Sequence, residues 1–339
     1  MAEVYGQRIQ TTVQQKYLPF VVDTVLNSNV LFQRIVRGAK KWSGRNLRMP
    51  IKVSKNSTGT SFSGFDTFAT SATDNRQFLE YGPKFYQITV ALPGDELSVA
   101  DTDEKVLDLM RLTIQSDTED MADDLGTIFY ADGTGNSSKD PLGMAALVDD
   151  GSSVTSIGGL SRSTYTTLQS TVTASSGTLT LAKLDTLWSA VTSGSQKPTA
   201  HYTTETGSNL YGQLLRPQER IMKDASRMKG LVGGTGFSAL EYAGKPVLMD
   251  EKCTSGVWFS VNENFLDWYG LPFFSAKAVS YKNQIKGNDY PTPMGLGFSW
   301  SDWIVPANAG AVVGHVYLGG EFVTNNPKRH GKLTGITSI

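Results

Sequence analysis

The segment from residue 101 to residue 131, DTDEKVLDLMRLTIQSDTEDMADDLGTIFYA, decides the fold. Its apolar residues recur at intervals of three and four, which predicts one long amphipathic helix. Asp101, with Glu104 in the same first turn, resembles a capping box, and Gly133 and Gly135 are typical of a helix end. At about 1.5 Å per residue the helix would be roughly 40 Å long. Because this is long for a helix of a globular enzyme, we expect a structural spine.

The residues before this helix begin with short helical pieces. Residues 1–45 carry apolar side chains at helical spacing, which Pro19 and the Asn27-Ser28-Asn29 cluster interrupt. The pattern predicts an N-terminal arm made of short helices. This arm has too little apolar surface to form a core of its own.

Residues 46–92 change to a period of two, which is typical of strands. LRMPIKV (47–53) and FYQITVAL (85–92) would be two strands of an extended hairpin around a long polar loop. So long a loop is unusual in a compact domain, and an isolated hairpin is marginal in water. We therefore expect the hairpin to project and to pack on a second subunit. Three aromatic residues in the loop would need such a cover: Phe62, Phe65 and Phe68.

The residues after the helix predict an α+β fold. Residues 151–290 alternate helical patterns at 180–194 and 208–217 with short strands, as expected for a lobe with its own core. Residues 301–331 read as two or three strands that must pair with earlier parts of the chain. Their natural partners flank the long helix, so the middle lobe would be an insertion between two parts of another domain.

Charge is separated along the chain, although its net charge is only −1. Between Asp23 and Asp66 there are eight basic residues and no acid, whereas Asp95 to Asp124 holds eleven acids and two bases. The two segments are either two solvated faces or surfaces that complement each other between copies of the chain. Nucleic acid on the basic segment is a weaker alternative, because the acidic helix would repel phosphate. The candidate contact residues are Arg34, Arg37, Lys40, Lys41, Arg45, Arg48, Lys52, Phe62, Phe65, Phe68, Asp117, Glu119, Asp120, Asp123 and Asp124.

The motifs of common enzyme classes are absent from the sequence. GTGNSS (133–138) follows a helix, whereas a dinucleotide fingerprint follows a strand, so we interpret it as a corner of the fold. His201, His315 and His330 lack paired ligand spacing, and the single cysteine, Cys253, excludes an intrachain disulfide. We predict no catalytic residue, no cofactor and no metal. No apolar run is long enough to cross a membrane, and no secretory signal is visible.

Taken in order, these segments resemble a tailed-phage major capsid protein of the Hong Kong 97 type. The resemblance extends over nearly the whole chain and rests on the ordered set rather than on any single motif. The segments that carry it are VLNSNVLFQRI (25–35), FYQITVALPGDELS (85–98), the long helix, PLGMAALV (141–148), GGLSRSTY (158–165), LEYAGKPVLMDEKCTSGVWFSVNENFLDWY (240–269) and VYLGGEFVTNNPKRHGKLTGI (316–336).

The resemblance implies a division of the chain into named parts. Residues 1–45 would be the N-terminal arm and 46–92 the extended loop that overlaps a neighbouring subunit. Residues 93–150 and 291–339 would form the peripheral domain with the spine helix, and 151–290 the inserted axial domain. In this arrangement the uncovered hairpin and the separated charges both find partners on the next subunit.

The resemblance also implies function and partners. The chain would assemble through pentamers and hexamers into an icosahedral head shell around double-stranded DNA, which its inner face would contact without sequence specificity. It would be made in the host cytoplasm and reside in the virion, with a portal and a decoration protein as further partners. Because the arm begins almost at Met1, we expect scaffolding from a separate protein or none. No Lys–Asn–acid set matches the crosslink of some relatives, so we predict none here.

Two other functions remain open at this level. A cellular nanocompartment shell of the encapsulin type would have the same fold and carry an enzyme cargo. A hydrolase or carbohydrate-binding module on the middle lobe would instead be a monomer or small oligomer with a ligand pocket.

Overall fold

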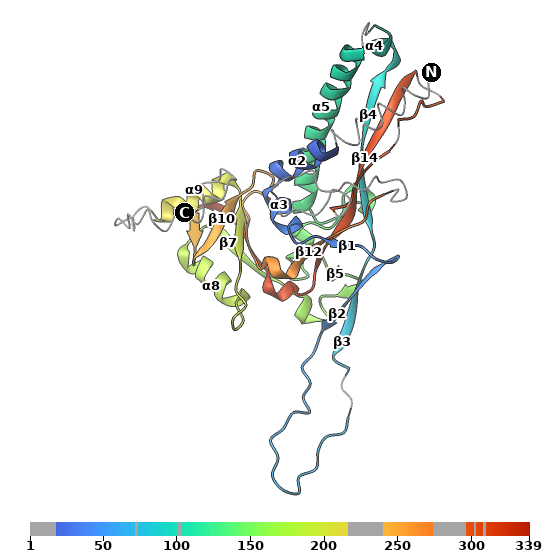
Figure 1. Cartoon of the computed structure of the whole chain (residues 1–339). Coiled ribbons are helices and arrows are strands. Elements are labelled where there is room, and N and C mark those ends of the chain that lie inside the picture. Colours follow the sequence, from blue (N-terminus) through green and yellow to red (C-terminus); the bar gives the residue numbers. More distant parts are fainter. Residues whose placement is uncertain are drawn as a thin grey trace.

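The computed structural model describes residues 18–71, 74–99, 103–215, 240–273, 296–301, 303–307 and 310–339. Figure 1 shows a central body with a lobe at one side, a helix-and-strand arm at one end and a long hairpin at the other. Two large β-sheets, of five and six strands, organise this body. None of the helices within the described residues combines the length and the apolar character needed to cross a bilayer.

Strand β14 (Ala311–Thr324) organises the five-stranded sheet. It pairs antiparallel with β4 (Lys84–Pro93), β12 (Leu266–Gly270) and β13 (Phe298–Trp300). The short β1 (Lys40–Lys41) adds to β12 in parallel. Because β4 directly precedes the long helix, the prediction that the later strands pair with a segment flanking that helix is confirmed.

The predicted spine helix is α5 (Asp103–Tyr130), and residues 101 and 102 lie outside the described residues. Helices α2 (Leu18–Ser28) and α3 (Val30–Val36) pack on it, and α4 (Gly94–Val99) follows β4 at the tip of the arm. The predicted short helices before residue 45 are thus confirmed for the described part. Residues 1–17 lie outside it.

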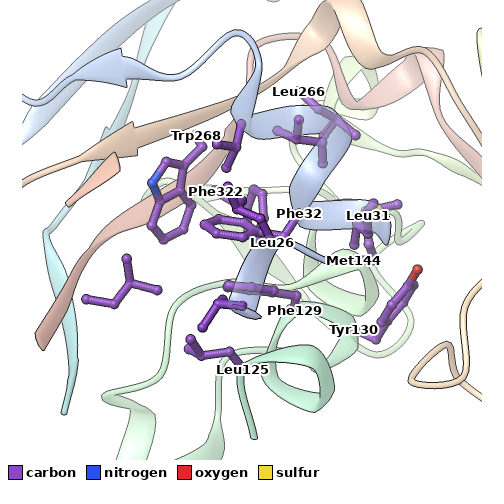
Figure 2. Close-up of a cluster of buried hydrophobic side chains, with 14 of the residues drawn as sticks. Leu26, Leu31, Phe32, Leu125, Phe129, Tyr130, Met144, Leu266, Trp268 and Phe322 are labelled. Carbon is purple, nitrogen blue, oxygen red and sulfur yellow. The ribbon is translucent and has the colours of Figure 1, made fainter. Parts of the chain in front are cut away.

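An aromatic cluster joins these helices to the sheet (Figure 2). Phe32 of α3 stacks on Phe129 of α5 with ring centroids 4.5 Å apart. Trp268 of β12 and Phe322 of β14 meet Phe32 edge-on at 5.2 and 6.0 Å. All four side chains are buried, and each contributes about 1.5–3 kcal/mol by burial. The first helices therefore share a core with α5 instead of forming one alone.

The six-stranded sheet builds the lobe at the side of the body. Helices α8 (Leu181–Val191) and α9 (Glu205–Leu215) pack against it and confirm the helices predicted near 180–194 and 208–217. A second core, with Trp258 at its centre, lies between sheet and helices. The strands run in the order β7 (Thr171–Thr178), β15 (Gly331–Ser338), β11 (Trp258–Val261), β8 (Ala200–Thr203), β10 (Lys245–Met249) and β9 (Leu240–Tyr242).

Two strands cross between the sheets. β12 belongs to the middle segment 151–290 but pairs with β14 in the five-stranded sheet. β15 belongs to 291–339 but lies inside the six-stranded sheet, between β7 and β11. The boundaries at residues 150 and 290 therefore do not separate the two sheets. The five-stranded sheet takes β12 from the middle segment, and the six-stranded sheet takes β15 from the C-terminal segment.

The hairpin differs from the prediction in its strand pairing. β2 (Leu47–Lys52) pairs with β3 (Arg76–Tyr81), not with residues 85–92. The segment 85–92 lies in β4, which pairs with β14 along its whole length. The prediction that 47–53 pairs with 85–92 is therefore wrong: β2 pairs with β3, and β4 belongs to the five-stranded sheet.

A polar corner connects α5 to the lobe. The short helices α6 (Gly135–Ser138) and α7 (Met144–Leu147) lead into β5 (Ser156–Ile157) and β6 (Leu160–Ser161). The nucleotide-like GTGNSS segment (133–138) includes α6, and its backbone is left-handed at several positions, with a φ of 77° at Gly133, 50° at Asn136 and 60° at Ser137. This supports our interpretation of the segment as a corner. Three short 3₁₀ helices complete the described elements: Thr166–Leu168, Glu263–Phe265 and Pro327–Arg329.

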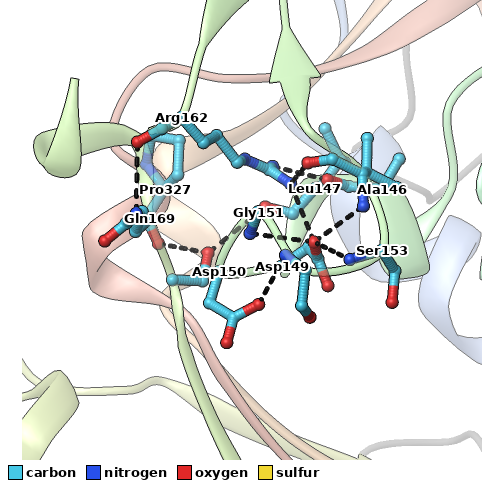
Figure 3. Close-up of polar contacts among 12 residues, drawn as sticks. Ala146, Leu147, Asp149, Asp150, Gly151, Ser153, Arg162, Gln169 and Pro327 are labelled. Carbon is cyan, nitrogen blue, oxygen red and sulfur yellow. Dashed lines mark hydrogen bonds and ion pairs between the residues drawn. The ribbon is translucent and has the colours of Figure 1, made fainter. Parts of the chain in front are cut away.

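Asp149 anchors this corner (Figure 3). Its Oδ2 accepts hydrogen bonds from the backbone N–H groups of Gly151 and Val154, and its Oδ1 accepts one from the side-chain ammonium (Nζ) of Lys332 in β15 at 3.1 Å. The fully buried Arg162 lies 3.5 Å away and donates to the Ala146 carbonyl. Burial alone would raise the pKa of Asp149, but these donors lower it below its ordinary value. The charged aspartate thus connects the loop at residues 151–154, Arg162 and β15.

Candidate assembly surfaces

The hairpin (residues 47–81) projects from the body of the molecule (Figure 1), and residues 54–71 of its loop are all exposed or half-buried. The described residues between β2 and β3 form no helix or strand. The predicted aromatic residues lie on it, with Phe62, Phe65 and Phe68 exposed by 66%, 107% and 60%. Phe62 and Phe68 meet edge-on at 5.1 Å. Exposed aromatic residues gathered on one loop are typical of an interaction surface.

Local hydrogen bonds shape the loop. The Asn56 Oδ1 accepts from the backbone and hydroxyl of Thr58 at 3.0 and 2.7 Å. The Asp66 Oδ2 accepts from the Ser63 backbone N–H at 2.8 Å, and the Asp66 N–H donates to the Ser63 carbonyl. Such side-chain turns let a loop hold a shape without a core. The tight turn from Ser63 to Asp66 presents Phe65 outward.

The stem of the hairpin carries cations in close opposition. Lys52 and Arg76 lie directly opposite each other in the β2–β3 register, and both are exposed. Like charges directly opposite on an antiparallel pair are destabilising. Neither has an ion-pair partner among the described residues, whereas Arg48 pairs with Glu80 at 3.4 Å. An acidic partner from outside the chain would relieve this opposition.

The remaining basic candidates divide into paired and unpaired groups. Arg34 pairs with Glu263, and Lys40 with Asp267, each at 2.6 Å, so both act within the chain. Arg37 also has an interaction within the chain. Lys41 and Arg45 are exposed, and within the described part of the chain neither makes an ion pair.

The acidic candidates divide in the same way along α5. Asp123 pairs with Lys252, Asp124 accepts a hydrogen bond from the Tyr86 hydroxyl at 2.7 Å, and Glu119 accepts one from Gln115 at 3.2 Å. The other two acids, Asp117 and Asp120, have neither a hydrogen bond nor an ion pair among the described residues. Burial, followed by the charge of Asp120, raises the pKa of Asp117. The middle of α5 therefore carries negative charge without an ion-pair partner among the described residues.

Glu321 is a functional candidate that the sequence analysis missed. It lies on β14 at the base of the hairpin and is buried. Its Oε1 accepts the Leu142 backbone N–H at 2.5 Å. The signal in the sequence was an acid in the otherwise apolar run VYLGGEFV (316–323). A carboxyl group there must either face solvent or change its pKa.

The three histidines occupy separate environments. His201 is packed among Trp188, Tyr242 and Trp258 in the lobe. His330 is fully buried beside Thr324, while His315 lies on β14 next to Thr89. Burial lowers the pKa of both His201 and His330 to about 3, so both are neutral. Within the described residues, His, Cys, Asp and Glu form no group of metal-ligand size.

Solved structures similar to this chain are capsid and encapsulin subunits. The capsid asymmetric unit of cyanophage A-1(L) matches with a TM-score of 0.66 and 15% identity over 91% of this chain and 93% of that one. The capsid of a native GTA particle matches with a TM-score of 0.56 and 11% identity over 92% and 90%. The SrpI encapsulin of Synechococcus elongatus matches with a TM-score of 0.54 and 12% identity over 90% and 87%.

Comparison of the sequences alone finds no match. No protein-family model matches the chain, and no curated protein is significantly similar to it. The structural likeness nevertheless extends over nine-tenths of the chain. The resemblance to phage capsid proteins is confirmed at the level of the fold: this chain has the Hong Kong 97-type capsid fold, a mixed α+β fold.

Proposed function

We propose that this protein is a shell-forming subunit that assembles with copies of itself into a closed icosahedral particle. The projecting hairpin carries the proposal, because the phenylalanines of its loop and the cations Lys52 and Arg76 of its stem are exposed and lie outside the cores of their own chain. The fold supports it, since the similar structures are subunits of capsid and encapsulin particles.

The parts of the subunit take the roles that the sequence analysis expected, with one revision. The hairpin would overlap a neighbour, the arm with α5, β4 and β14 would be the peripheral domain, and the lobe with α8 and α9 would be the axial domain. The revision concerns the crossing strands, because β12 belongs with the peripheral sheet and β15 with the axial one.

The charges suggest how the hairpin finds its neighbour. Lys52 and Arg76 on the stem need an acid, and Asp117 and Asp120 on α5 need a base. Contacts of this kind guide orientation more than they supply affinity. We propose that the stem of one copy docks near α5 of the next, with Lys41 and Arg45 adding to the positive side.

In its more specific form the proposal is that of a tailed-phage major capsid protein. The particle would enclose double-stranded DNA in the virion, and its assembly would involve a scaffolding protein, a portal and a decoration protein. Two of the similar structures with TM-scores above 0.5, those of cyanophage A-1(L) and phage XM1, are phage capsids.

Negative-stain electron microscopy of the purified chain, with light scattering on the same sample, tests the general proposal. Closed shells, or rings that convert to shells, are the expected result. If the purified chain stays monomeric, it is co-expressed with the scaffolding protein from the same genome. A chain that remains monomeric at every salt and protein concentration, and also with that scaffold, would contradict the proposal.

The encapsulin match favours a second candidate, a nanocompartment shell that carries a protein cargo. The two functions predict different contents for particles purified from the native source. A phage capsid protects double-stranded DNA from nuclease, whereas a nanocompartment contains a stoichiometric protein and little nucleic acid. Absorbance ratio, nuclease protection and mass spectrometry of the particle contents decide between them.

A further inference from the structure

The junction between the projecting hairpin and the body contains a carboxyl group that assembly contacts do not explain. Glu321 is only 2% exposed, and its Oε1 accepts the Leu142 N–H at 2.5 Å. By strand alternation its side chain lies on the face of β14 opposite to the core residue Phe322. The body thus buries an acid just where the hairpin begins.

Groups from several segments act on Glu321. Lys84, the first residue of β4, is the cation whose charge reaches it. Tyr81, the last residue of β3, and Arg162 face the same junction, because both Glu321 and Arg162 act on the Tyr81 hydroxyl. Tyr269 of β12 lies opposite Glu321 in the strand register.

Burial governs the protonation of Glu321. It raises the pKa of the carboxyl group to about 8, and the Leu142 N–H, the Lys84 charge and the Phe322 N–H offset only part of this effect. The group is therefore mostly neutral at mildly acidic pH and mostly charged at clearly alkaline pH. A neutral Glu321 matches the present geometry, in which Lys84 is engaged elsewhere.

The ammonium group of Lys84 forms a hydrogen bond with the corner after α5. Its Nζ donates to the Ser138 carbonyl oxygen. Glu321 contacts the same corner through the N–H of Leu142, so the ammonium of Lys84 and the carboxyl of Glu321 both bond to residues 138–142. The charge of Lys84 already acts on Glu321, and a charged, buried Glu321 would attract this half-buried ammonium more strongly than a neutral one does.

We propose that loss of the Glu321 proton draws Lys84 away from Ser138 and changes the angle at which the hairpin leaves the body. Only Gly82 and Pro83 separate Lys84 from Tyr81, so a movement of Lys84 passes directly into β3. The idea deepens the proposed function, since it makes the geometry of the assembling element depend on pH. It rests on that function only for its effect on assembly.

Distance measurements on the unassembled subunit test the proposal. Spin labels at Ser61→Cys in the loop and Asp108→Cys on α5, in a Cys253→Ala background, report the hairpin position by pulsed dipolar spectroscopy. We expect the mean distance to change between pH 6.5 and pH 9.5 with a midpoint near the pKa of about 8. Glu321→Gln keeps the acceptor for Leu142 but cannot ionise, so its distance should not depend on pH.

Two further variants separate the parts of the argument. Lys84→Gln removes the responding cation and should also abolish the change, although Glu321 can still ionise. Glu80→Gln, on the exposed surface of the stem, should respond to pH as the parent does. If Glu321→Gln does not fold, as judged by circular dichroism, Lys84→Gln decides the question.

An unchanged distance in the parent across this pH range would overturn the proposal, and so would an equal change in Glu321→Gln or Lys84→Gln. Assembly of the same proteins is scored separately by electron microscopy. Shells formed by a chain whose hairpin does not respond to pH would overturn this inference alone. Absence of shells at every pH, with or without the scaffolding protein, would contradict the proposed function and leave the distance result intact.

Discussion

At the scale of single residues, Arg34 shows that a cation of the basic segment can form a bidentate ion pair within its own chain. Its Nε and Nη2 donate to the two carboxylate oxygens of Glu263 at 2.6 and 2.9 Å. Tyr202 and Thr199 donate to the same carboxylate at 2.6 and 3.0 Å. Burial alone would raise the pKa of Glu263, but these donors and the Arg34 charge lower it. Arg34 thus connects α3 to the 3₁₀ turn at Glu263–Phe265 within one chain.

Replacing Arg34 by Ala should therefore destabilise the subunit. Removing one partner of a buried pair costs about 3–5 kcal/mol, and because Arg34 is 31% exposed we expect a smaller loss, about 2 kcal/mol. The loss should be full above the ordinary pKa of a glutamate and shrink as the pH falls through the lowered pKa of Glu263. This follows because a protonated Glu263 no longer needs the cation. Urea unfolding at several pH values measures it.

Arg45→Ala is the matched control, because Arg45 is exposed and makes no ion pair with the described residues. It should change the free energy of unfolding by less than about 0.5 kcal/mol. Equal losses in the two variants would show that Arg34 does not act through Glu263.

At the scale of elements, the projecting hairpin and the body are stabilised by different means. The hairpin stem adds Leu79 and Tyr81 to the core, but residues 54–71 bury no side chain. The body, in contrast, holds both hydrophobic cores. Changes in the loop should therefore affect assembly without affecting the folding of the subunit.

Deletion of residues 55–75 tests this separation. The shortened subunit should keep its far-UV circular dichroism and its thermal midpoint, because it loses no core contact. It should form no shells, since it lacks the surface that we propose overlaps a neighbour. A full-length variant with Phe62, Phe65 and Phe68 changed to Ser should fail in the same way. Normal particles from either variant would refute the role of the loop.

The corner after α5 differs from the loop, because at Gly143 its packing leaves no room for a Cβ atom. A Cβ on Gly143 would lie 2.4 Å from the Ala131 carbonyl oxygen and 2.5 Å from that of Ile128. Both oxygens belong to the backbone and cannot move aside cheaply. Gly143→Ala should therefore lower the free energy of unfolding by about 1–3 kcal/mol.

Gly59→Ala is a suitable comparison, since nothing lies within 4 Å of the added carbon. It should leave the free energy of unfolding almost unchanged in the same urea experiment. A stable Gly143→Ala protein would mean that the corner rearranges more readily than its packing suggests.

The sequence predicted elements better than it predicted their partners. Periodicity identified α5, α8 and α9, because each buries one face at the helical period. It could not identify the partner of β2, since a period of two fits any strand edge, and RQFLEY (76–81) was not recognised as a strand. Arg34 and Lys40 were predicted to contact a second copy because they belong to the basic segment. Their acids, Glu263 and Asp267, lie more than 200 residues away in sequence, and only the fold brings them close.

At the scale of the whole molecule, the hairpin stem carries unpaired positive charge and α5 carries unpaired negative charge among the residues that the structure describes. The stem retains Lys52 and Arg76 without ion pairs in the described structure, and α5 retains Asp117 and Asp120. Intrachain pairs occupy some of the other charges, including Asp123 with Lys252. The net charge of −1 therefore conceals two surfaces that could serve association.

Charge reversal tests this arrangement. Reversing Lys40, Lys41 and Arg45 together would also leave Asp267 without its partner, so the sharper variant is Lys41→Glu with Arg45→Glu. We expect slower assembly and fewer shells, with the largest defect at low salt, where screening is weakest. Light scattering against salt concentration measures this. Lys197→Glu with Lys328→Glu, two exposed lysines of the lobe side, is the control and should assemble normally. Equal shell yields for both variants would show that the separated charges only face solvent and do not act in assembly.

The late position of β14 and β15 in the chain has a consequence for synthesis. β14 joins β4, β12 and β13, and β15 lies between β7 and β11, so each of these two strands follows all of its partners in the sequence. Pairings that join distant segments close slowly, because the intervening chain must first be ordered. A nascent chain on the ribosome would therefore hold two incomplete sheets until both strands have emerged. Copies translated from one message could then collide without being able to polymerise, which would keep shell growth separate from protein synthesis.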